Sequence, residues 1–217
     1  MFSPEEAIQY GVTSYGLRIP LTRKIASHFF AGIRKKSKEE IFDLCEILLK
    51  SGISEERIIA FDWAFRLRKM YSSSDFYILE SWLKTYVKGW GSCDDICTHA
   101  FGEFLYQFPG FFKEVKKWTE SENRWLRRAS AVILIYSIRR DKCCEQGFEI
   151  ADVLLQDTDS MVQKGYGWML KEISNVHPQK VFEYVMEYKE VMPRTSLRYA
   201  IEKLSPDLRT KAMARPV

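Results

Sequence analysis

A period of about 35 residues is the feature that most constrains what this chain can fold into. Apolar residues recur at helical spacing along the chain, without convincing strand alternation. The predicted helices form pairs, and five positions shortly after the start of a second helix correspond: Ile58, Asp94, Arg128, Gln163 and Leu197. Their separations by subtraction are 36, 34, 35 and 34 residues. Such a period predicts stacked helical hairpins in an all-α solenoid, and an irregular helical bundle is the alternative.

Helix-start and helix-stop signals divide the whole chain, and no linker is long enough to separate two domains. We therefore predict one repeat domain over residues 1–217. Long helices are expected over 93–106 and 121–140, with Ser92 and Ser121 near their starts. The other helices are expected to begin at or near Ser3, Pro20, Ser37, Ser54, Ser74 and Pro109, and to cover 144–155, 158–174, 178–189, 193–204 and 206–214.

Charge and cysteine content restrict the compartment and the kind of partner. The formal net charge is +4, which favours anionic partners only mildly. The cysteines number five, an odd count, and no secretory signal is present, so a disulfide framework is not expected. The longest apolar run, 131–136, is too short to cross a bilayer. We therefore expect a cytoplasmic protein without a membrane partner, and the absence of any sign of oligomerisation favours a monomer.

Asp94 is the candidate catalytic residue. With Ser92 as N-cap, Asp94 and Asp95 would lie in the first helical turn, where unpaired amides and the helix dipole favour negative charge. Capping electrostatics alone therefore explains an acidic residue here. The same placement would also keep the carboxylate ionised, which suits the stabilisation of positive charge rather than proton donation.

Two tryptophans stand in unusual surroundings. Trp90 lies between Gly89 and Gly91, a loop or helix-start context in which a tryptophan need not be fully buried. Trp168 follows Gly165-Tyr166-Gly167. A glycine inside a helix costs about 1 kcal/mol relative to alanine. Two of them indicate a close approach to the backbone, either by another helix or by a ligand. Core packing is the alternative role for both tryptophans.

Basic residues recur on the predicted second helices. Arg127 and Arg128 interrupt an otherwise apolar helix, and a guanidinium can hold a phosphate through two parallel hydrogen bonds. If the hairpins stack, several of five further basic side chains would line one groove with them: Arg57, Lys164, Lys171, Arg194 and Arg198. A directed patch of this kind predicts nucleic-acid binding. For each residue alone, a solvated charged surface is the alternative.

Other familiar chemistries lack a signature in the sequence. Gly165-Tyr166-Gly167 does not complete a phosphate-binding loop. Cys93 and Cys97 share a helix face, but no second pair completes a zinc site. The three histidines are scattered, and we interpret Cys143-Cys144 as incidental. We expect neither a metal nor a cofactor.

In their order along the chain, several segments together resemble the AlkD-like DNA alkylation repair family, DNA glycosylases built from HEAT-like helical repeats. The resemblance covers most of the chain. It is carried by Tyr15-Gly16-Leu17-Arg18-Ile19-Pro20, Glu55-Glu56-Arg57, Trp90-x-x-x-Asp94, Asn123-Arg124-Trp125-Leu126-Arg127-Arg128, Val162-Gln163-Lys164-Gly165-Tyr166-Gly167-Trp168 and residues 193–204. It implies an all-α, HEAT-like helical-repeat solenoid (an α-α superhelix) with a concave basic face.

The resemblance also implies roles for single residues. Asp94 corresponds to the family's catalytic aspartate. Trp90 and Trp168 correspond to the tryptophans that flank the damaged nucleotide, and Arg128 corresponds to an arginine at the DNA backbone. Bulkier family residues are replaced by glycine beside Trp90, and an aromatic of the N-terminal part has only Tyr10 as a loose counterpart. These departures concern substrate range more than fold.

The implied activity is hydrolytic excision of cationic N3- or N7-alkylated purines from duplex DNA, by a nucleoid-associated enzyme without metal or cofactor. Such a base is already a good leaving group, so the enzyme need only stabilise the positive sugar and place a water. The resemblance further implies capture of the lesion without a deep base pocket. Two other functions stay open: a non-catalytic DNA-binding protein of the same fold, and a helical scaffold for a protein partner.

Overall fold

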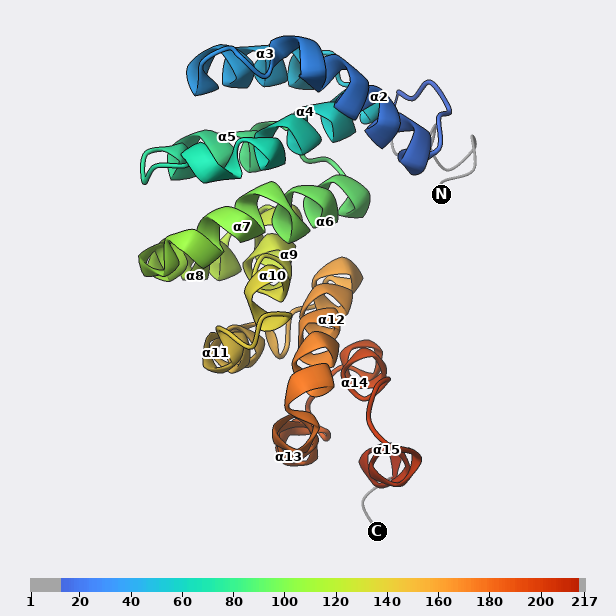
Figure 1. Ribbon diagram of the computed structural model, residues 1–217. Coiled ribbons are helices and arrows are strands. Elements are labelled where there is room, and N and C mark those ends of the chain that lie inside the picture. The colour runs from blue at the N-terminus through green and yellow to red at the C-terminus, as the bar shows by residue number, and fades with distance from the viewer. Residues whose placement is uncertain (1–12, 215–217) are drawn as a thin grey trace. The chain divides into compact units, whose positions relative to one another are not determined.

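The computed structural model describes residues 13–214, and its architecture is a helical repeat (Figure 1). Apart from an isolated bridge between Thr13 and Ile53, these residues contain no β-strand. No helix within this described range is long and apolar enough to cross a membrane. The predicted all-α fold is confirmed. The helix predicted at Ser3, and Tyr10, lie outside the described residues.

The chain divides into two compact units, residues 1–108 and 109–217. Unit 1 contains α2 (Ile19–Ile33), α3 (Lys38–Lys50), α4 (Ser54–Arg66), the 3₁₀ turn η1 (Arg68–Met70), α5 (Asp75–Tyr86), α6 (Trp90–Thr98) and α7 (Ala100–Gln107). Unit 2 contains η2 (Pro109–Phe111), α8 (Phe112–Lys117), η3 (Trp118–Glu120), α9 (Arg124–Val132), α10 (Ile135–Ile138), α11 (Cys144–Leu154), α12 (Ser160–Val176), α13 (Pro178–Tyr188), α14 (Arg194–Ala200) and α15 (Pro206–Met213). The single domain over 1–217 stays a prediction.

The period seen in the sequence is the spacing of the second helices. Helices α4, α6, α9, α12 and α14 begin 36, 34, 36 and 34 residues apart by subtraction, and each aligned position is the fourth or fifth residue of its helix. Within unit 1, α4 packs on α2, α3 and α6. Within unit 2, α12 packs on α9, α11, α13 and α14. Each unit is therefore built from stacked hairpins.

Helix starts follow the capping chemistry in several places. At α3 the Ser37 hydroxyl accepts the Glu40 amide N–H, while the Glu40 carboxylate accepts the Ser37 N–H, so the capping box is complete. From this start, Ile41, Cys45 and Leu49 fall on one buried stripe four residues apart. The predicted start of this helix is confirmed.

Glu55 connects the start of α4 to the segment that precedes α2. Its carboxylate accepts hydrogen bonds from the Ser14 hydroxyl at 2.7 Å and from the Tyr15 and Leu17 amides at 3.0 and 2.9 Å. The turn between those amides needs a left-handed residue, which Gly16 supplies with a φ of 77°. The start of α4 thereby fixes the chain that enters α2.

The prediction of one helix over 93–106 is wrong, because the helix breaks at His99. The Thr98 hydroxyl donates to the Asp94 carbonyl at 2.7 Å, and His99 Nδ1 lies 2.9 Å from the Asp95 carbonyl oxygen. These side chains occupy carbonyl groups that a continuous helix would offer to later amides. The result is two short helices, α6 and α7.

The prediction of one helix over 121–140 is also wrong, since α9 and α10 are separate. The Leu134 N–H donates to the carbonyl of Ala131, three residues back, which tightens the backbone between them. The start also differs, because Asn123 rather than Ser121 is the N-cap and accepts the Trp125 N–H at 2.9 Å.

Ser92 is not an N-cap, which corrects the premise used for Asp94. Helix α6 starts at Trp90, with extended Gly89 as its N-cap, and the Ser92 hydroxyl donates to the Gly89 carbonyl at 3.0 Å from inside the helix. Asp94 is therefore the fifth helical residue, and the first turn holds no acidic side chain. The unpaired amides of the helix start do not account for Asp94, because their effect fades within the first turn.

The two glycines of α12 mark close packing between helices. A Cβ on Gly167 would lie 2.8 Å from the Tyr199 Cβ and 3.0 Å from the Ser196 backbone, so α14 passes directly over this position. A Cβ on Gly165 would lie 3.0 Å from the Arg128 Cγ on α9. Of the two explanations for these glycines, approach by another helix is confirmed.

Candidate functional site

Helix α6 presents different chemistry on different faces. Cys93, Ile96 and Cys97 are fully buried in unit 1. Trp90 is 40% exposed, and Asp94, one turn later, is half-buried. Residues four apart lie on the same side of a helix, so the indole and the carboxylate share one accessible face.

The neighbouring carboxylate, Asp95, has a different task. It forms an ion pair with Arg23 of α2 and lies 3.2 Å from the His99 ring. Arg23 also reaches Asp62 of α4 at 3.3 Å, and Arg66 reaches the same carboxylate at 2.5 Å. Hydrogen bonding to Asp95 raises the pKa of His99 despite the opposing effect of its burial. Asp95 therefore ties α6 to α2 and α4.

Trp168 is held by partners that the sequence did not single out. Its indole N–H donates to the Glu172 carboxylate at 2.8 Å, and Arg139, directly after α10, pairs with the same carboxylate at 2.8 Å. The Arg139 guanidinium also lies over the Trp168 ring, 5.9 Å from its centroid. Burial raises the pKa of Glu172, but hydrogen bonds from Arg139 and Trp168 outweigh burial and lower it. The four-residue spacing of Trp168 and Glu172 was the available signal in the sequence.

Arg127 and Arg128 both have internal partners in unit 2. Arg128 is only 5% exposed, and its Nη1 donates to the Met161 carbonyl of α12 at 2.5 Å. Arg127 pairs with Asp157 at 2.6 Å and donates to the Ser121 carbonyl at 2.8 Å. These contacts join α9 to the α11–α12 turn and to α12. The role of both arginines at a DNA backbone stays a prediction.

The remaining predicted DNA-binding residues differ in accessibility. Arg57 is buried, donates to the Gly52 carbonyl at 3.3 Å, and has a pKa lowered by burial. Lys164 is half-buried, whereas Arg194 and Arg198 are exposed. Within residues 13–214, none of Lys164, Arg194 and Arg198 has an ion-pair partner, and Arg194 only lies 3.8 Å from the Met213 sulfur. These three cations are therefore the most available to a phosphate among the predicted set.

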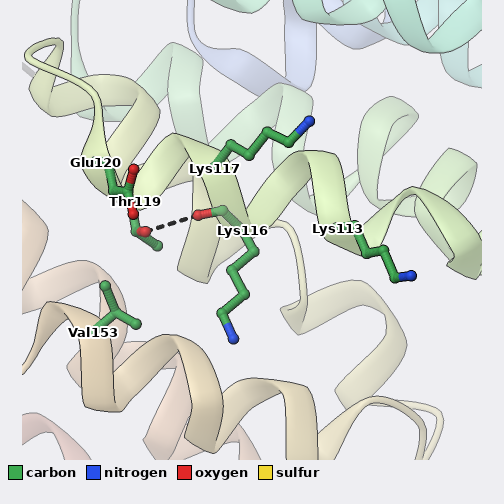
Figure 2. Close-up of a pocket in the computed structure, with 6 residues that line it drawn as sticks. All are labelled: Lys113, Lys116, Lys117, Thr119, Glu120 and Val153. Carbon is green, nitrogen blue, oxygen red and sulfur yellow. Dashed lines mark hydrogen bonds between the residues drawn. The ribbon is translucent and has the colours of Figure 1, made fainter.

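A separate basic hollow lies in unit 2 between α8 and α11. Figure 2 shows Lys113, Lys116 and Lys117 pointing in different directions from α8, with Val153 on α11 below them. Lys116 pairs with Glu149 at 3.0 Å, and Lys117 pairs with a glutamate of its own helix. The ammonium groups do not converge on one point, and the hollow is open to solvent. We do not assign the candidate site to it.

The predicted site residues fall into both units. Trp90, Asp94 and Arg57 belong to unit 1, and the other predicted site residues belong to unit 2. The structure brings Trp90 and Asp94 together on α6 and places Lys164 and Trp168 on α12. The concave basic face that would unite the two groups stays a prediction.

Comparison with known proteins connects this fold to a family. The family model described as DNA alkylation repair enzyme matches residues 5–204. A predicted DNA alkylation repair enzyme from Enterococcus faecalis is similar in structure, with a TM-score of 0.81 at 16% identity over 93% of this chain and 94% of its own. The smu.31 protein from Streptococcus mutans UA159 is similar with a TM-score of 0.62 at 18% identity, over 86% and 99% of the two chains. No curated protein matches. Because the family model spans nearly the whole sequence, the chain belongs to the DNA alkylation repair enzyme family.

Proposed function

We propose that this protein is a monofunctional DNA glycosylase that excises cationic N3- or N7-alkylated purines from duplex DNA. The observation that carries the proposal is the pair on α6: an exposed indole and a half-buried carboxylate on one accessible helix face. Membership in a DNA alkylation repair family supports the same chemistry. We further propose that it acts as a monomer in the cytoplasm, at the nucleoid.

The reaction mainly requires the protein to stabilise positive charge. The C1′–N bond breaks with its electron pair leaving on the purine, which thereby becomes neutral. The sugar passes through a cationic transition state, water adds at C1′, and a proton leaves to solvent. Asp94, as an ionised carboxylate, would stabilise the positive sugar. Trp90 and Trp168 would each offer a ring face to the same cation, worth roughly 0.5–2 kcal/mol.

The test is release of 7-methylguanine or 3-methyladenine from alkylated duplex DNA, measured without added metal or cofactor. Base release that depends on protein supports the proposal. Salt-dependent duplex binding without release would favour the non-catalytic DNA-binding protein. Absence of both would favour a scaffold for a protein partner.

DNA binding should depend on the accessible cations of unit 2. We expect Lys164→Ala and Arg198→Ala each to weaken duplex binding uniformly across sequences and to reduce the slope of log K against log salt by about 1. Fluorescence anisotropy across a salt series measures both quantities. Lys113→Ala, in the hollow of Figure 2, is the matched control with an unchanged slope. A changed slope for Lys113→Ala alone would place the interface on α8 instead.

Glu172 should act as a positioning residue for Trp168. We expect Glu172→Gln to lower the excision rate by about 10-fold, because a loosened indole no longer holds its productive geometry. Glu202→Gln makes the same chemical change at a carboxylate that pairs with Lys171, and should leave the rate unchanged. If Glu172 acts through Trp168, adding Glu172→Gln to Trp168→Phe should cost nothing further. Additive losses in the double variant would contradict this role.

A further inference from the structure

A cluster of metal-ligating side chains lies in unit 2, apart from every residue assigned above. It consists of Asp141, Cys144 and His177, whose ligand atoms all lie within 4.8 Å of one another. His177 Nε2 and an Asp141 carboxylate oxygen are 2.8 Å apart. Cys144 is buried, His177 is half-buried and Asp141 is exposed, so one side of the cluster is open to solvent.

The repeat architecture creates this cluster. Asp141 lies in the turn between α10 and α11, and His177 lies in the turn between α12 and α13. The two residues are 36 residues apart, one repeat period, so they occupy corresponding turns of successive hairpins. Because α11 packs on α12, stacking brings the two turns together. Asp141 and His177 are far apart in the sequence, so their sequence positions alone did not connect them, although one repeat period separates them.

Local contacts hold the two turns in place. Cys144 is the first residue of α11, and His177 caps both α12 and α13 in a non-helical conformation. Beside the cluster, Lys180 of α13 pairs with Glu145 of α11 at 2.7 Å. The three side chains therefore sit on a framework that does not depend on an ion.

We propose that Asp141, Cys144 and His177 form a Zn²⁺ site with a fourth position for water. Their carboxylate oxygen, thiolate sulfur and imidazole nitrogen are the donors that zinc accepts, whereas the thiolate disfavours Mg²⁺ and Ca²⁺. Bond lengths of about 2.0–2.3 Å place two ligand atoms of a tetrahedral site roughly 3.3–3.8 Å apart. The His177 and Asp141 ligand atoms are 2.8 Å apart and every pair lies within 4.8 Å, so small side-chain movements suffice. On binding, the thiol proton leaves to solvent and an S–Zn bond forms.

Co²⁺ and Zn²⁺ added to the reduced full-length protein test the site directly. We expect one Co²⁺ per chain, with a thiolate-to-cobalt charge-transfer band and the visible bands of four-coordinate cobalt, both removed by Zn²⁺. Cys144→Ser should abolish the charge-transfer band, whereas Cys143→Ser, at the adjacent thiol, should retain it. Losing an outer-shell partner of a metal site costs 10–100-fold in affinity, so loss of a ligand in His177→Gln should weaken binding by at least about 100-fold.

Two results would overturn the site. One is wild-type protein without a cobalt–thiolate band, which would leave the cluster as a His–Asp ion pair beside a buried thiol. The other is a band that persists unchanged in Cys144→Ser and His177→Gln. Circular dichroism of each variant checks that the helices are intact. Absorption is read without DNA, so the outcome does not depend on the proposed excision activity.

Discussion

Replacing Asp94 with asparagine should lower the single-turnover rate of base excision by about 100- to 1,000-fold, the usual cost of removing one preorganised electrostatic stabiliser. The amide keeps the size of the side chain and removes its negative charge. The cationic sugar then loses its opposing charge, while duplex binding, which depends on other residues, should change little. Release of 7-methylguanine and anisotropy on the same duplex separate the two effects.

Two other aspartates make this experiment specific. Asp43→Asn removes an exposed carboxylate of α3 and should leave excision unchanged. Asp95→Asn removes the ion pair with Arg23 and should lower the thermal midpoint, while the excision rate per folded molecule is retained. An Asp94→Asn variant that excises at the wild-type rate would refute the catalytic role. A variant that loses only stability would place Asp94 with Asp95 among the structural residues.

The repeat was predictable because it depends on local chemistry that recurs. Helix periodicity, and helix starts such as the Ser37 capping box, depend on residues that are close together in the sequence. The aligned positions therefore fall at the fourth or fifth residue of their helices. The prediction of Ser92 as the N-cap of α6 is wrong because the role of this serine depends on where the helix starts. Ser92 is a good cap in isolation, but its hydroxyl bonds to the Gly89 carbonyl once the helix starts earlier at Trp90.

The environment of each charged side chain could not be read from helical spacing alone. Arg127 and Arg128 are neighbours in sequence, yet one pairs with Asp157 and the other is buried against α12. The two contacts depend on how α9 meets the α11–α12 turn and α12, which adjacent residues do not encode. The same holds for Arg139, which reaches Glu172 on another helix. Long-range partners of this kind require the fold.

The largest expected loss of stability from a single methyl group is at Gly167. We expect Gly167→Ala to reduce the free energy of unfolding by about 1–3 kcal/mol, because the new Cβ meets atoms that cannot move independently. Those atoms are the Tyr199 Cβ and the Ser196 Cα and carbonyl oxygen, at 2.8, 3.0 and 3.0 Å. Helix α14 must therefore shift away from α12. Urea denaturation followed by circular dichroism measures the change.

Two other glycines complete a graded series. A Cβ on Gly32, in α2, meets nothing within 4 Å, so Gly32→Ala should stabilise by about 0.5–1 kcal/mol through helix propensity alone. A Cβ on Gly165 meets the Arg128 Cγ at 3.0 Å, a side-chain atom rather than backbone, so its cost should lie between the other two. Equal shifts for all three would show that α14 does not constrain Gly167. Since Gly167 precedes Trp168, a displaced α12 should also reduce excision, whereas Gly32→Ala should leave the rate intact.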